Sequence, residues 1–115
     1  MFEIISRPDM KKTSAFILDS DQWKLVYTRT SEYVDSIDIH NLSGAVAYKS
    51  PTKSPDGDNY ESLDAGAVDH IDEDPYEIWM KRTVAAPATQ YIKVTVRWFS
   101  EDSIKRVKAK KQKWE

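Results

Sequence analysis

The sequence predicts an α+β fold, in which one antiparallel sheet of about five or six strands has a C-terminal helix packed on it. Most of the chain consists of runs rich in aromatic and β-branched residues, several of which alternate between apolar and polar positions as half-buried strands do. Residues 100–115 instead begin with a serine cap and acidic residues and end in cations, the order that a helix dipole favours. Because 115 residues is close to the commonest domain size, we expect a single domain over residues 1–115.

Strand-like segments fill the first half of the chain. We expect residues 15–18 and 23–28 to pair as a hairpin. In residues 33–40, the period of two places Ile37 and Ile39 toward the core. Two shorter strand candidates are residues 2–5, with the sequence Phe-Glu-Ile-Ile, and residues 44–48.

The middle of the chain has weaker signals. Residues 50–59 contain two prolines and a glycine, which predict an exposed loop. In residues 60–72, apolar side chains recur at helical spacing, although Gly66 weakens a helix at this position. We therefore expect a short, irregular helix there.

The clearest predicted unit is an antiparallel hairpin of residues 76–84 and 90–99. In its second arm, one side is apolar and the other is polar, so one face of the sheet is expected to be dry. The apolar side consists of Ile92, Val94, Val96 and Trp98. The helix that begins after Ser100 follows directly and has only a narrow apolar stripe with which to contact the sheet.

Composition excludes several classes of protein. The chain has no cysteine, which excludes disulfides, thiolate metal sites and a cysteine nucleophile. No window approaches the roughly 18 apolar residues of a membrane span, and the N-terminus has no signal-peptide pattern, so we expect a cytoplasmic protein without membrane contact. The triplet Asn41-Leu42-Ser43 matches the glycosylation pattern, but it has no secretory context and is discarded.

Charge is segregated along the sequence although the net charge is only −2. An acidic segment without any Lys or Arg consists of Asp56, Asp58, Glu61, Asp64, Asp69, Asp72, Glu73, Asp74 and Glu77. A basic helix carries Lys105, Arg106, Lys108, Lys110, Lys111 and Lys113. These stretches are either solvated surfaces that neutralise one another, or contact sites for a protein partner or for nucleic acid.

Signatures of chemistry are weak. Asp69, His70 and Asp72 place three potential metal ligands within four residues, with His40 as a further candidate, but the spacing matches no known metal motif. The sequence contains no nucleophile elbow and no phosphate-binding loop. We therefore predict no metal site, no cofactor and no catalytic residue, and a protein that is not an enzyme.

These observations favour a small non-catalytic protein–protein interaction module. Such a module would be an accessory, inhibitory or assembly component, of a kind that also occurs in viruses and mobile elements. It would bind a protein partner or further copies of itself through the acidic segment and the basic helix. Two alternatives stay open, namely a nucleic-acid-binding protein that uses the basic helix and a metal-assisted hydrolase.

Overall fold

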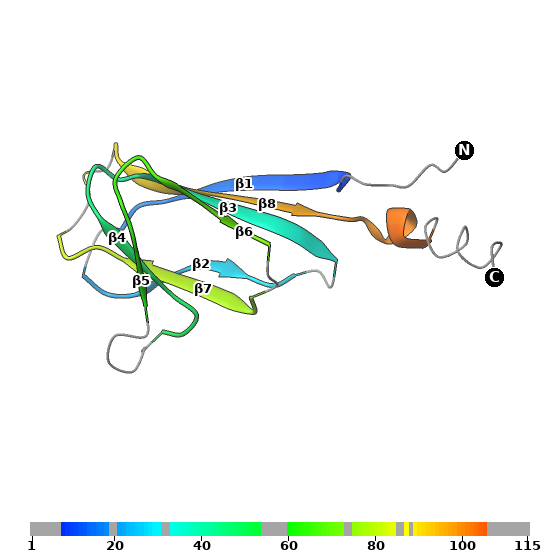
Figure 1. The fold of residues 1–115 in the computed structure, drawn as a ribbon, viewed down its shortest axis with the longest axis horizontal. Coiled ribbons are helices and arrows are strands. Elements are labelled where there is room, and N and C mark those ends of the chain that lie inside the picture. The colour runs from blue at the N-terminus through cyan, green and yellow to red at the C-terminus, as the bar shows by residue number, and fades with distance from the viewer. Residues whose placement is uncertain are drawn as a thin grey trace.

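The structure of this chain, a computed structural model, is nearly all-β (Figure 1). It describes residues 8–18, 21–30, 33–53, 60–72, 75–84, 87 and 89–105. The only helical segment among these residues is one turn at 101–105. The strands are β1 (Met10–Phe16), β2 (Lys24–Thr28), β3 (Val34–Leu42), β4 (Ala47–Ser50), β5 (Glu61–Leu63), β6 (Val68–Ile71), β7 (Glu77–Lys81) and β8 (Tyr91–Trp98).

The strands form two four-stranded antiparallel sheets that face each other. Sheet A has the order β1-β8-β3-β6 and sheet B the order β2-β7-β4-β5. The first strand pairs with the last, the second with the seventh, the third with the sixth and the fourth with the fifth. The chain therefore runs like one long hairpin whose successive pairs alternate between the sheets, which is the topology of an eight-stranded jelly roll.

The predicted α+β fold with a single sheet is wrong, because every pair of consecutive strands except β4 and β5 is divided between the two sheets. In both predicted hairpins, residues 15–28 and 76–99, the first arm falls in one sheet and the second in the other. Alternation of apolar and polar residues is the same whether a strand pairs with its neighbour or packs against it across a sandwich. The sequence pattern consequently identifies strands without identifying their partners.

The core lies between the two sheets. Ile37 and Ile39 of β3 are fully buried, as predicted, and face Val96 and Val94 of β8 across the ladder. Sheet B contributes inward side chains that include Ile78 and Met80 of β7. The remaining buried apolar residues are Leu18, Val26, Tyr27, Ala47, Leu63 and Ile92.

A fully buried asparagine joins the two sheets at one end of the sandwich. The Nδ2 of Asn41, near the end of β3, donates hydrogen bonds to the carbonyl oxygens of Ala45 (2.8 Å), Leu63 (2.9 Å) and Asp64 (3.2 Å). Its Oδ1 accepts from the backbone N–H of Ser43 (3.0 Å) and from the Ser43 hydroxyl (2.6 Å). Because this amide is buried and fully used, Asn41 is inaccessible to glycosylation in the folded protein.

The helix predicted over residues 60–72 is wrong. This region contains β5 of sheet B and β6 of sheet A, separated by a turn in which Gly66 has a φ of 80°. The Gly66 N–H donates to the carbonyl of Asn41 (2.7 Å), and the Asn41 N–H donates to the carbonyl of Ala67 (3.0 Å). The left-handed conformation that glycine adopts easily lets the chain cross between the sheets here.

The C-terminal helix does not pack on a sheet within the part that the structure describes. Its first turn continues from the end of β8, beyond the strands (Figure 1). The predicted cap at Ser100 is confirmed, since its hydroxyl oxygen accepts from the Ser103 N–H (3.2 Å). The Asp9 carboxylate accepts hydrogen bonds from the hydroxyl (2.6 Å) and the N–H (2.8 Å) of Ser100, which lower the pKa of Asp9 to about 2. Among the described residues, no helix is long and apolar enough to cross a bilayer.

Replacing the buried amide tests how much the junction between the sheets contributes to stability. We expect Asn41→Leu to lower the free energy of unfolding by about 3 kcal/mol, because several buried carbonyl and N–H groups lose their partners. Chemical denaturation monitored by tryptophan fluorescence measures this change. Ser62→Ala, at an exposed position of β5, is the matched control and should change stability by less than about 0.5 kcal/mol. Equal unfolding midpoints for the two variants would contradict the role assigned to Asn41.

Candidate functional site

The two sheets differ in length. In sheet A, β1, β3 and β8 have 7, 9 and 8 residues, whereas no strand of sheet B exceeds 5. Sheet A therefore extends past the end of sheet B (Figure 1). Part of the inner face of β1 and β8 has no strand of sheet B opposite it.

A groove of about 290 Å³ opens between the two sheets at the edge formed by β1 and β2. The register of β1 against β8 places Lys12, Ser14 and Phe16 on the same inward side as Val96, Val94 and Ile92. Met10, at the next inward position, is 40% exposed, although an inward position of a closed sandwich would be covered. The lining residues are Lys12, Ser14, Phe16, Leu25, Val26, Tyr27, Thr28, Thr30, Val94, Val96 and Trp98.

The groove is mainly apolar and has a strand edge at its rim. Its floor includes the buried Val94 and the half-buried Val96 and Trp98. The polar residues of the lining are serine, threonines and Tyr27, and Lys12 is its one charged residue. Among the described strands, β1 pairs with β8 alone, so its other edge presents backbone N–H and C=O groups to any strand that enters. This arrangement suits apolar side chains on an extended chain.

The opposite edge of the sandwich is closed by an ion pair. Lys49 of β4 lies opposite Met80 and points inward, where its ammonium group pairs with the carboxylates of Asp69 in β6 and Glu61 in β5 (3.3 Å to Glu61). Burial would lower the pKa of Lys49, but the hydrogen bond to Asp69 and the two carboxylate charges raise it above its usual value. Inward-pointing charges of this kind prevent an open edge from pairing with another chain.

The described residues of the acidic segment do not form one surface. Glu61 and Asp69 turn to Lys49, Asp72 pairs with His70, and Asp64 is exposed in the turn before Gly66. Asp56, Asp58, Glu73 and Asp74 lie outside the described residues. Glu77 is half-buried at the start of β7.

Of the six cations of the predicted basic helix, the structure describes only Lys105, which is exposed. Arg106, Lys108, Lys110, Lys111 and Lys113 lie outside the described residues. The proposed charge contact between the basic helix and the acidic segment therefore stays a prediction.

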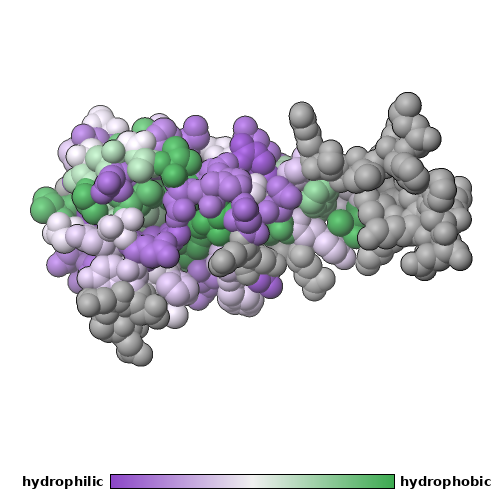
Figure 2. All heavy atoms as spheres, in the orientation of Figure 1, coloured by the Kyte–Doolittle hydropathy of each residue, from purple (hydrophilic) through white to green (hydrophobic). Residues whose placement is uncertain are grey.

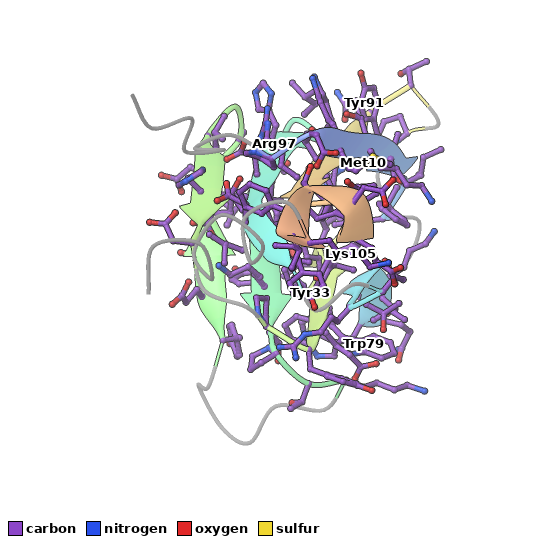
Figure 3. All side chains as sticks on the ribbon, turned by 90° about the vertical axis from the view of Figure 1, so that its right-hand side faces the viewer. Met10, Tyr33, Trp79, Tyr91, Arg97 and Lys105 are labelled. Carbon is purple, nitrogen blue, oxygen red and sulfur yellow. The ribbon has the colours of Figure 1, made fainter. Side chains whose placement is uncertain are left out.

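A chain of alternating charges crosses the outer face of sheet A. Asp38 in β3 accepts from the Arg97 Nη1 of β8 (2.5 Å) and from the His70 Nδ1 of β6 (2.5 Å), and the His70 Nε2 contacts Asp72 (2.6 Å). Figure 3 shows Arg97 and Trp79 on opposite sides of the sandwich. Burial alone would raise the pKa of Asp38, but the hydrogen bonds from His70 and Arg97 lower it. The hydrogen bond that the His70 ring donates to Asp38 raises the pKa of His70 despite some desolvation, and Asp72 adds to this effect.

The candidate metal ligands are divided between two faces. Asp69 lies opposite Ile39 and points between the sheets, whereas His70 points to the outer face of sheet A. Within the described ranges, no group of three or more His, Asp or Glu side chains is arranged so that it could hold a metal ion. The alternation of a β-strand separates residues that are adjacent in sequence.

An aromatic cluster covers part of the outer face of sheet B. The rings of Trp23 and Tyr60 (5.9 Å between centroids) and of Tyr48 and Tyr60 (5.4 Å) pack edge to face. The Lys81 ammonium lies 4.9 Å from the Trp23 ring centroid. The rings and Lys81 thus cover one another rather than forming a flat platform for stacking.

Exposed apolar side chains are otherwise dispersed. The large ones among the described residues are Met10, Val46, Tyr60, Val68, Tyr76 and Val84. On the face shown in Figure 2, apolar residues form small separate patches between hydrophilic ones. In the part of the chain that the structure describes, the groove between β1 and β2 is consequently the best candidate site.

The sequence contains only a weak signal for this groove. The sequence pattern predicts the apolar side of β8 but not the partial exposure of Val96 and Trp98. In β1, the inward positions include Lys12 and Ser14, and these polar residues obscure the strand pattern. Polar residues at inward positions of an edge strand are the signal that points to an incompletely covered interior.

Titration of His70 tests the charge chain on sheet A. We expect its pKa to lie above the ordinary value of 6.5, and Asp38→Asn to lower it toward that value. The stabilising effect of the protonated ring should be complete below pH 6.5 and be lost as the pH rises through the raised pKa. NMR titration of the ring protons measures this shift. Asp35→Asn, which removes an exposed carboxylate from the same strand, should leave it unchanged.

The ion pair at the closed edge yields a second prediction. Lys49→Met should lower the free energy of unfolding by about 1–3 kcal/mol, because Asp69 loses its cation in a partly buried place. Adding Asp69→Leu should recover most of the lost free energy of unfolding. It should also increase aggregation, since the edge then lacks inward charge. Denaturation and light scattering measure the two effects, with Lys93→Met at an exposed position of β8 as the control. A double variant no more stable than Lys49→Met would contradict this account.

A scan against protein-family models, a search of curated proteins and a search of solved structures each found no match to this chain.

Proposed function

We propose that this chain is a small non-catalytic protein-interaction module, an assembly or accessory component, that binds an extended polypeptide segment in the groove between β1 and β2. The observation that carries the proposal is an apolar groove of about 290 Å³ beside an edge of β1 that no described strand pairs with. Strand addition uses such an edge for backbone hydrogen bonds and uses pockets for alternate side chains of the bound strand.

The groove suits a peptide better than other ligands. Its volume is at the lower end of small-molecule sites, which measure about 300–1,000 Å³. A nucleic-acid backbone needs several cations in contact with its phosphates, whereas Lys12 is the one charge of the lining. The jelly-roll topology does not choose a function, because capsid proteins, lectins and cupins share it.

This proposal moves the binding surface away from the charged stretches. Glu61, Asp69 and Asp72 have partners within the chain, so they are less available to a second molecule. The basic helix remains the candidate surface for the nucleic-acid alternative.

Selection from a random peptide library tests the proposal. We expect the immobilised protein to enrich peptides in which apolar residues alternate, and Ser14→Phe, which fills the groove, to weaken their binding at least about tenfold. Thr13→Phe is the matched control, since it adds the same side chain to the same strand on its outer face and should preserve the affinity.

Two outcomes would count against the groove. Peptides that bind the wild type and Ser14→Phe equally would place the interaction elsewhere, and the absence of enriched peptides would remove the support for peptide binding. Retention of a mixed-sequence oligonucleotide at about 150 mM salt, together with either outcome, would favour the nucleic-acid alternative instead.

A further inference from the structure

We propose that the occupant of the groove is residues 2–5 of a second copy of this chain, which add a strand to the free edge of β1. This inference rests on the proposed function and names its partner. Residues 1–7 lie outside the described residues, so the case for them comes from their sequence and from the place where the described chain begins.

The segment has the chemistry that the groove requires. In Phe2-Glu3-Ile4-Ile5, Phe2 and Ile4 share one side of an extended strand. With these two side chains directed into the groove, they meet a lining of valines, leucine and aromatic rings. Glu3 then lies on the outer side of the added strand, opposite the exposed Ala15 of β1, where its carboxylate stays in solvent.

The same segment of its own chain reaches the groove poorly. A two-residue hairpin loop at residues 8–9 requires a positive φ at its first residue, which Pro8 does not allow. A three-residue loop ordinarily requires a positive φ at Asp9, and no described residue other than glycine has one. With a longer loop, Phe2 extends no farther along β1 than Thr13, which passes Lys12 but stops short of the groove residues Ser14 and Phe16.

The anchoring of Asp9 also directs the chain away from its own groove. Its carboxylate is held by the hydroxyl and N–H of Ser100, which follows β8. Since β8 lies on one side of β1 and the edge open to an added strand lies on the other, this contact holds Asp9 toward the β8 side. The favoured arrangement is therefore reciprocal exchange, in which two copies each donate a segment and each accept one, as in a two-fold symmetric dimer.

Light scattering of variants tests the exchange. Between about 10 µM and about 500 µM, the full chain should reach twice its mass of 13.3 kDa. The donor variant Phe2→Asp/Ile4→Asp and the groove variant Ser14→Phe should each remain at 13.3 kDa with an unchanged circular dichroism spectrum. Ile5→Asp is the matched control for the donor, because it places a charge on the other side of the same segment and should still dimerise.

Mixing the two defective variants is the decisive step. The donor variant has an intact groove and the groove variant has an intact donor segment, so the mixture should regain a mass of twice 13.3 kDa through one exchanged strand. A wild type that is monomeric throughout, a dimer that survives Phe2→Asp/Ile4→Asp, or a mixture that stays monomeric would overturn the inference. If the wild type is monomeric while selected peptides bind in a manner sensitive to Ser14→Phe, the proposed function survives and only the self-partner fails.

Discussion

The buried amide of Asn41 is the interaction on which the arrangement of this protein depends. It belongs to sheet A, yet it bonds to carbonyl groups at the end of β5 in sheet B and in the turns on either side. Burying this amide without hydrogen-bond partners would cost more free energy than its hydrogen bonds contribute. The junction therefore forms completely or not at all. By fixing where β5 ends and β6 begins, Asn41 brings Asp69 opposite Lys49 and thereby closes one edge of the sandwich.

As a result, the two lateral sides of the sandwich differ in how well they cover the core. At the β5–β6 side, an ion pair links the sheets and occupies the space between them. At the β1–β2 side, the longer sheet A overhangs, and the interior is reached through a groove lined mostly by apolar residues. Because one side of the core is sealed and the other is accessible, a ligand can reach the interior only from the β1–β2 side. The charged groups on the outer faces, such as Asp38 and Arg97, largely satisfy one another.

Local patterns determined what the sequence was able to predict. The inward positions of Ile37 and Ile39, the apolar side of β8 and the cap at Ser100 depend on neighbouring residues, and all three are present. The sheet partners depend on residues far apart in sequence, and no local pattern encodes them. The prediction of a helix over residues 60–72 was wrong because the apolar residues of two short strands and a turn recur at helical spacing. The groove was missed because exposure of an inward face follows from unequal sheet lengths.

The jelly-roll pairing also constrains the order in which the molecule can acquire its structure. Thr13 and Thr95 contact each other across the β1–β8 ladder although they are 82 residues apart. During synthesis, β1 leaves the ribosome long before β8 exists, and β3 also lacks β8, its central partner. Neither sheet A nor the groove can form until β8 has been made, so folding is necessarily late and slow in the manner of proteins with distant contacts. Until β8 has been made, the lysines at positions 11 and 12 also protect β1, because charge on an unpaired strand discourages association with other chains.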